Sequence, residues 1–82
     1  MVKVILDPFF KKKLEKIKDS SLREKVKKQI RKIVESPLTG KPMMYDRKGT
    51  REIYVAPYRL SYIYFSEKEE LWFLDLYHKD EQ

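Results

Sequence analysis

The fold is decided by residues 51–65, REIYVAPYRLSYIYF. Apolar and polar side chains alternate along this stretch, which is the period of a β-strand and not that of a helix. Ala56-Pro57 interrupts it, so we expect two strands, at residues 51–55 and 58–65, joined by a tight connection. Residues 71–77 predict a third strand after a polar turn, and three consecutive strands with short turns indicate an antiparallel meander.

Upstream of the meander, apolar residues recur with the spacing of amphipathic helices. Asp7 followed by Pro8 predicts a helix start, because aspartate caps free amide groups and proline suits the first turn. Ser21 and Glu24 have the spacing of a capping box, so we expect a second helix with Ser21 as its cap. This helix should end before Pro37, because the residue preceding a proline is disfavoured in helical geometry.

Residues 2–6 alternate as a short strand, and residues 37–49 contain the breakers of a loop. The order is therefore β-α-α-β-β-β, an α+β fold. We expect the two helices to form an antiparallel hairpin packed on one face of an antiparallel sheet. The 82 residues suffice for a single domain, residues 1–82. A chain of this size buries only about 60% of its unfolded surface on folding, so we expect a thin core.

Composition excludes several classes of protein. Cysteine is absent and there is one histidine, which rules out disulfides, thiolate nucleophiles and sites with several histidine ligands, so we expect no metal and no cofactor. No apolar run approaches the roughly 20 residues of a membrane-spanning helix, and the N-terminus lacks a signal-peptide layout. We expect a cytoplasmic protein without a membrane partner.

The charge of the chain is +6 and unevenly distributed. Residues 11–32 hold 11 basic and 3 acidic side chains, whereas residues 67–82 hold 6 acidic and 2 basic ones. A basic helical region of this density indicates a polyanion partner such as RNA, DNA or a ribosome. The alternative is a solvated helical face in a Lys/Glu-rich protein. The absence of Asn and Cys fits adaptation to heat.

Strand alternation predicts that one face of the sheet is left free by the helices. The helices should cover the more apolar face, formed by Ile53, Val55, Leu60, Tyr62, Tyr64, Trp72, Leu74 and Leu76. The other face should present Glu52, Tyr54, Arg59, Ser61, Asp75, Tyr77 and Lys79, with Ile63, Phe65 and Phe73 at its far end.

The residue types on this free face suit nucleic-acid chemistry. Arginine binds phosphate with two parallel hydrogen bonds, tyrosine stacks on bases, and a carboxylate accepts a proton. The alternative for Arg59 is a cross-strand ion pair with Glu52 or Asp75. Histidine is a residue type that can serve as acid or base at neutral pH, so His78 suits proton transfer. Strict alternation aims it at the helix side, however, where a structural, partly buried role is the alternative.

Four short motifs resemble those of a known family. In chain order they are Val34-Glu35-Ser36-Pro37, Gly40-Lys41-Pro42, Tyr58-Arg59-Leu60-Ser61-Tyr62 and Tyr77-His78-Lys79-Asp80. With the element order, they resemble the RelE/ParE toxin superfamily of type II toxin–antitoxin systems. The resemblance covers nearly the whole chain. The motif Gly-Lys-Pro is similar to the YoeB branch, and the C-terminal residues 76–82 are similar to archaeal RelE-like proteins.

The resemblance implies a ribosome-dependent mRNA endoribonuclease that inhibits translation without a metal, and a RelB-like antitoxin as its partner. Arg59 matches the arginine that contacts the scissile phosphate, His78 a proton-transfer histidine and Lys79 a second basic position. Glu52 stands where some members carry a lysine and is a candidate base. The expected contacts with mRNA or the ribosome are Lys41, Arg47, Lys48, Arg51, Tyr54 and Tyr77.

Two other functions fit the same sequence. One is a ParE-like inhibitor of DNA gyrase, which would bind its target without a nuclease site. The other is a basic RNA-binding domain without toxicity. Ordinary surface charge is also an alternative for each of the basic side chains in the predicted site.

Overall fold

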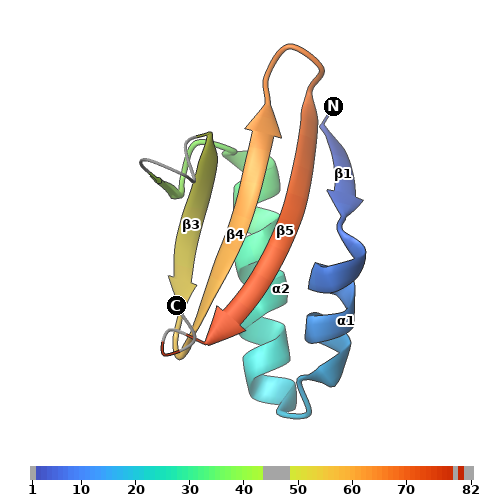
Figure 1. Ribbon diagram of the computed structural model, residues 1–82, viewed down its shortest axis with the longest axis vertical. Helices are drawn as coiled ribbons and strands as arrows, with labels where there is room; N and C mark the ends of the chain where they lie inside the picture. The colour runs from blue at the N-terminus through green and yellow to red at the C-terminus, as the bar shows by residue number, and fades with distance from the viewer. Residues whose placement is uncertain (1, 44–48, 79, 81–82) are drawn as a thin grey trace.

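The computed structural model describes residues 2–43, 49–78 and 80. It confirms the α+β fold (Figure 1). The elements are β1 (Lys3–Leu6), α1 (Pro8–Lys16), α2 (Ser20–Glu35), β2 (Lys41–Pro42), β3 (Thr50–Val55), β4 (Tyr58–Phe65) and β5 (Glu70–His78). The short strand β2 lies in the segment that was expected to be loop only.

The strands form one sheet in the order β1-β5-β4-β3-β2. The meander β3-β4-β5 is antiparallel as predicted, and β2 pairs antiparallel with β3. The expectation of an entirely antiparallel sheet is wrong, however, because β1 pairs parallel with β5. Parallel neighbours need a long connection, and the two helices and the first strands of the meander supply it between β1 and β5.

Aspartate caps begin both helices. The Asp7 carboxylate accepts a hydrogen bond from the Phe9 amide, and Pro8 occupies the first turn, as predicted. The prediction that Ser21 caps α2 is wrong, because the Asp19 carboxylate accepts hydrogen bonds from the Ser21 and Leu22 amides. Asp19 thereby satisfies amide groups that have no partner inside the helix, and α2 begins at Ser20.

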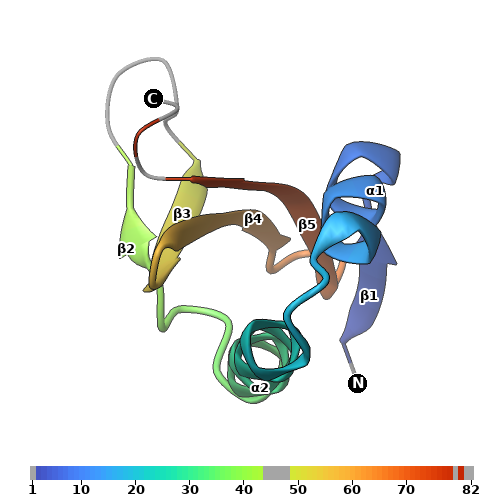
Figure 2. The same cartoon turned by 90° about the horizontal axis from the view of Figure 1, so that it is seen from below.

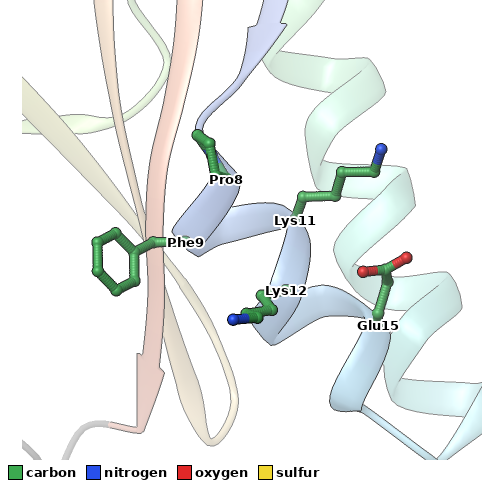
Figure 3. Close-up of a pocket in the computed structure, with 5 residues that line it drawn as sticks. All are labelled: Pro8, Phe9, Lys11, Lys12 and Glu15. Carbon is green, nitrogen blue, oxygen red and sulfur yellow. The ribbon is translucent and has the colours of Figure 1, made fainter.

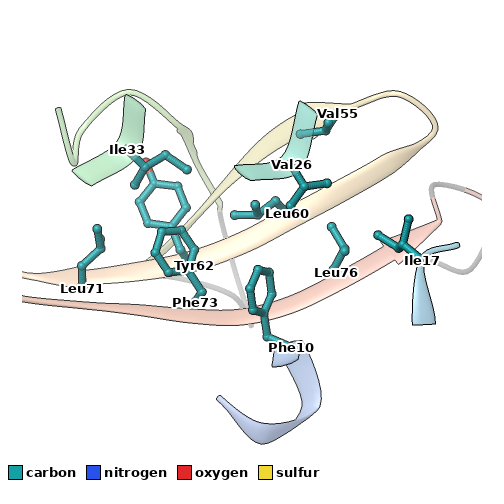
Figure 4. Close-up of a cluster of buried hydrophobic side chains, with 10 residues drawn as sticks. All are labelled: Phe10, Ile17, Val26, Ile33, Val55, Leu60, Tyr62, Leu71, Phe73 and Leu76. Carbon is teal, nitrogen blue, oxygen red and sulfur yellow. The ribbon is translucent and has the colours of Figure 1, made fainter. Parts of the chain in front are cut away.

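The helices run in opposite directions and occupy different positions against the sheet. Figure 2 shows α2 beneath one face of the sheet, whereas α1 lies beside β5 near the β1 edge. The core fills the space between them (Figure 4), with contributions from both helices and from β3, β4 and β5. Its buried members are Phe10, Ile17, Val26, Ile33, Val55, Leu60, Tyr62, Leu71, Phe73 and Leu76.

A β-bulge in β5 changes which side chains enter the core. Asp75 lies opposite Ser61, but Phe73 lies opposite the next residue of β4, so Leu74 is an extra residue in β5. One extra residue reverses the alternation of every side chain beyond it. Phe73 is therefore fully buried in the core and Trp72 lies on the other face, the reverse of the predicted arrangement.

Candidate functional site: the helix-free face of the sheet

The sheet face turned away from α2, which we call the open face, carries its side chains in cross-strand rows. Directly opposed residues of neighbouring antiparallel strands point to the same face. One row contains Lys41, Glu52, Ser61 and Asp75, on β2 to β5 in that order. The adjacent row contains Tyr54, Arg59 and Tyr77. The structure thus brings together the side chains predicted for this face, except Phe73, which is buried in the core, and Lys79, which lies outside the described residues.

Arg59 lies at the middle of the second row and reaches solvent. Its side chain is 37% exposed, and its guanidinium carbon lies 5.7 Å from the centre of the Tyr54 ring. A cation at this distance from an aromatic ring is attracted by the ring face. Tyr54 is itself 53% exposed. An exposed guanidinium beside an exposed ring can bind a phosphate and a base of the same nucleic-acid strand.

Glu52 is a buried carboxylate between Arg59 and Tyr77. Its side chain is only 4% exposed, and its Oε1 lies 3.8 Å from Arg59 Nη1. Its Oε2 accepts a hydrogen bond from the hydroxyl of Tyr77, which is also buried. A buried charge is tolerated when neighbouring groups of this kind hold it. The ion pair that was considered an alternative for Arg59 is therefore present, together with an accessible guanidinium.

Further cations lie at the two ends of the first row. Lys41 is exposed on β2, directly opposite Glu52. At the other end, Lys13 of α1 places its Nζ 2.8 Å from Asp75 Oδ1. Sequence reasoning did not predict the contact of Lys13 with Asp75, because the helical period only places Lys13 off the apolar stripe. Its contact with the open face follows from the position of α1 beside β5.

His78 lies on the opposite side of the sheet from Arg59. It is the cross-strand neighbour of Tyr58, whereas Arg59 pairs with Tyr77. The His78 and Tyr58 rings meet edge to face with their centres 5.7 Å apart, and His78 Nδ1 lies 3.5 Å from Asp80 Oδ2. The helix-side direction predicted from strict alternation is confirmed. Arg59 and His78 are consequently not brought together on the open face.

Arg51 also points away from the open face. Its Nη1 donates hydrogen bonds to the Gly40 carbonyl at 2.7 Å and to the Leu38 carbonyl at 3.3 Å, which ties β3 to the loop after α2. In the same region, the Tyr62 hydroxyl donates to the Pro37 carbonyl and accepts from the Gly40 amide, both at 2.8 Å. Arg51 is thus engaged in holding the loop that leads to Lys41.

Burial raises the pKa of Tyr62 above its ordinary value of 10.0, although the hydrogen bond from the Gly40 amide and the charge of Arg51 oppose this shift. The close approach also explains the glycine, because a Cβ at position 40 would lie 2.6 Å from the Tyr62 hydroxyl. Tyr62 of β4 and Arg51 of β3 thus hold the loop that precedes β2.

Other predicted features lie elsewhere. Arg47 and Lys48 fall outside the described residues, as does Lys79. A surface hollow on α1 is lined by Pro8, Phe9, Lys11, Lys12 and Glu15, none of which is a predicted site residue (Figure 3). Within residues 2–43, 49–78 and 80, no group of three or more His, Asp or Glu side chains is arranged to hold a metal. No helix in the described ranges has the length and apolar character to cross a membrane.

Comparison with known proteins identifies the family. A family model for the ParE toxin of the type II toxin–antitoxin system parDE matches residues 4–82. The chain belongs to this family. The predicted membership of the RelE/ParE superfamily is thereby confirmed, and the protein is a toxin of a type II toxin–antitoxin system. No curated protein matches the toxin in sequence.

Solved structures share the fold of the toxin. A YoeB/ParE toxin from Agrobacterium tumefaciens superposes with a TM-score of 0.84 at 19% identity, covering 94% of this chain and 98% of its own. The toxin–antitoxin complex RelBE2 from Mycobacterium tuberculosis gives 0.80 at 26% identity, with 96% and 94% covered. The intact Escherichia coli RelBE complex gives 0.78 at 23% identity, with 93% and 94% covered. At these identities the likeness confirms the arrangement of helices and sheet.

Proposed function

We propose that this toxin cleaves mRNA on the ribosome and that Arg59 holds the phosphate at which the strand is cut. The observation that carries the proposal is the position of Arg59, 37% exposed on the helix-free face and next to the exposed ring of Tyr54. A guanidinium matches the geometry of a phosphate and stabilises the charge that develops on it during cleavage.

The proposed reaction uses the 2′-hydroxyl of the RNA as nucleophile. Its oxygen forms a bond to the adjacent phosphorus, the bond from phosphorus to the 5′ oxygen breaks, a base takes the 2′ proton, and an acid protonates the departing oxygen. His78 and Lys79 are the proposed proton-transfer and charge-stabilising groups. His78 packs against Tyr58 on the other side of the sheet from Arg59. The proposal therefore rests mainly on Arg59. The ribosome would supply much of the substrate positioning.

Lys41 and Tyr54 are the proposed RNA contacts on either side of the Arg59–Glu52 pair. Lys41 is exposed at the edge strand β2 and adds positive charge at the end of the first row. Tyr54 offers a ring on which a base can stack. The other proposed contacts are Arg47 and Lys48, for which the structure gives no position, and Arg51 and Tyr77, whose described contacts are within the protein.

The proposed partner is an antitoxin of the RelB type. Two of the similar structures are complexes of a toxin with its antitoxin, from E. coli and M. tuberculosis. The net charge of +6 suits an acidic antitoxin segment, because complementary charge speeds association and disfavours wrong partners. The proposed place of action is the cytoplasm, where ribosomes are found.

The test is a cleavage assay with mRNA bound to ribosomes, alongside a growth assay without antitoxin. We expect Arg59→Ala to lower the cleavage rate about 100-fold or more, as for the loss of one donor to a transition-state oxyanion. Lys68→Ala, which removes an equal charge from the exposed turn between β4 and β5, is the matched control and should retain activity. Unchanged cleavage by Arg59→Ala would refute the proposal.

A second candidate function is inhibition of DNA gyrase. It is favoured by the family model, which describes ParE toxins, and by the separation of Arg59 and His78 across the sheet. A supercoiling assay with purified gyrase discriminates the two functions. Inhibition of supercoiling together with absence of mRNA cleavage would favour this candidate.

A further inference from the structure

Glu52 connects two side chains of the open face through its two carboxylate oxygens. Oε1 faces Arg59 Nη1 at 3.8 Å, and Oε2 accepts the hydrogen bond from Tyr77. Neither partner is adjacent to Glu52 in sequence, and its directly opposed neighbour on β4 is Ser61. The carboxylate of this β3 residue therefore reaches diagonally across the sheet and contacts one residue of β4 and one of β5.

Burial separates the role of Glu52 from that of Arg59. The Glu52 side chain is 4% exposed, whereas that of Arg59 is 37% exposed. A base in RNA cleavage has to come within hydrogen-bond distance of the 2′-hydroxyl. Glu52 is covered by its neighbours, and its two oxygens face Arg59 and Tyr77. Because Glu52 is buried and Arg59 reaches solvent, we expect Glu52 to influence a bound RNA through Arg59.

The guanidinium of Arg59 needs a group that orients it. A long arginine side chain has many rotamers, and a phosphate ligand gains most from a guanidinium that is already in place. Among the residues that the structure describes, Arg59 Nε is buried without a hydrogen-bond partner. The described contacts of the guanidinium are the Glu52 carboxylate and the Tyr54 ring.

We propose that Glu52, itself held by the Tyr77 hydroxyl, is a positioning residue that orients Arg59 toward the phosphate and does not act as the base. The inference rests on the proposed function for its kinetic consequence, although the orientation of Arg59 can be measured without any cleavage. It also predicts opposite effects of Glu52 on RNA binding and on the rate of cleavage. The negative charge of Glu52 weakens binding of an anionic RNA near Arg59, and its contact with Arg59 speeds the reaction.

The kinetic test compares Glu52→Gln and Tyr77→Phe with two matched controls. Glu24→Gln removes the carboxylate of the exposed Glu24–Lys27 ion pair on α2, and Tyr64→Phe removes a hydroxyl from β4. We expect Glu52→Gln to lower the maximal cleavage rate on ribosomes about 10- to 100-fold, the scale of a small misplacement of a reacting group. The toxin concentration at half-maximal rate should stay the same or fall.

A double-mutant cycle distinguishes positioning from the alternatives. If Glu52 acts through Arg59, Glu52→Gln causes no further loss once Arg59 is alanine. An equal loss in both backgrounds would overturn the inference, since it would mean that Glu52 acts independently of Arg59. Loss of the acidic, ascending limb of the pH–rate profile in Glu52→Gln, with Arg59 unchanged, would also overturn it, because a base and not a positioning residue would have been removed.

A measurement without cleavage separates this inference from the proposed function. The Nε–H signal of Arg59 in a ¹⁵N NMR spectrum reports the order of its side chain. We expect Glu52→Gln and Tyr77→Phe to reduce this order, and Glu24→Gln and Tyr64→Phe to leave it unchanged. Reduced order in a toxin that cleaves no mRNA supports the positioning role and refutes the proposed function. Unchanged order refutes the positioning role, whatever the activity. Tyr77→Phe keeps the carboxylate and provides the test if Glu52→Gln fails to fold.

Discussion

Arg59 and Glu52 form an ion pair across the diagonal between β4 and β3, with 3.8 Å between Nη1 and Oε1. Cross-strand alignment alone would place Arg59 opposite Tyr54, and Glu52 opposite Ser61. The pair is asymmetric, because the carboxylate is buried and the guanidinium remains partly exposed. An arginine held on one side by a buried acid and open on the other is suited to bind an anion from solvent.

Substitution of His78 tests whether a residue on the other side of the sheet contributes to cleavage. If His78 transfers a proton as proposed, His78→Gln should lower mRNA cleavage about 100-fold or more, as Arg59→Ala does, although its ring packs against Tyr58 and not near Arg59. A loss below about 10-fold would remove His78 from the proposed reaction. The measurement is single-turnover cleavage on ribosomes. Losses of equal size would mean that His78 reaches the phosphate when RNA is bound.

Tyr54 provides a test of base stacking on the open face. Tyr54→Ala removes a ring that is 53% exposed and should weaken the apparent affinity for ribosome-bound mRNA by roughly 5- to 100-fold, whereas Tyr54→Phe keeps the ring and the affinity. Phe9→Ala, an exposed ring on α1, serves as control. If the alanine and phenylalanine variants behave alike, the hydroxyl and not the ring is the contact.

The Tyr62 hydroxyl should contribute measurably to folding stability. Tyr62→Phe leaves the Gly40 amide and the Pro37 carbonyl without this partner, so we expect the free energy of unfolding to fall by about 1–3 kcal/mol. Tyr64→Phe on the same strand should change it by less than about 0.5 kcal/mol. Chemical denaturation measures both, and a neutral Tyr62→Phe would show that water replaces the hydroxyl without cost.

The raised pKa of Tyr62 predicts an alkaline loss of stability. The folded protein favours the neutral phenol, so its contribution is complete below the unfolded pKa of 10.0 and is lost as pH rises above that value toward the folded pKa. Unfolding of the native protein between about pH 9 and about pH 11 should therefore show a steeper decline than unfolding of Tyr62→Phe. Equal slopes would contradict the pKa shift.

The Lys13–Asp75 contact should link α1 weakly to the open face. Its side chains are 38% and 41% exposed, so the coupling energy in a Lys13→Ala, Asp75→Ala double-mutant cycle should be about 0.5–1 kcal/mol at low salt and smaller at high salt. The exposed Glu24–Lys27 pair, with 4.0 Å between its charged atoms, is the control and should show less coupling. A coupling that salt leaves unchanged would indicate a desolvated pair.

Local chemistry was sufficient to predict most of the elements. Asp7-Pro8 marked the start of α1, Pro37 the end of α2, and Ala56-Pro57 the connection between β3 and β4. These signals act within a few residues, through capping, the restricted geometry around proline and side-chain periodicity. The alternation of β3 and β4 also placed Glu52, Tyr54 and Arg59 on one face correctly.

The errors arose where the local sequence allowed more than one arrangement. Ser21 and Asp19 both suit a helix cap, and the strand residues 71–77 alternate equally well with or without a bulge at Leu74. Packing of Phe73 against Phe10 and Tyr62 accompanies the bulged register, which also moves Trp72 to the open face.

The sequence by itself determined the order of the helices and of every strand except β2, the basic character of the chain and the residue types available on the free face, because periodicity and charge are local properties. Only the tertiary structure decided that Glu52 is buried between Arg59 and Tyr77 and that Lys13 reaches Asp75. These relationships depend on strand register and on the position of α1, which are set by packing between residues far apart in the chain.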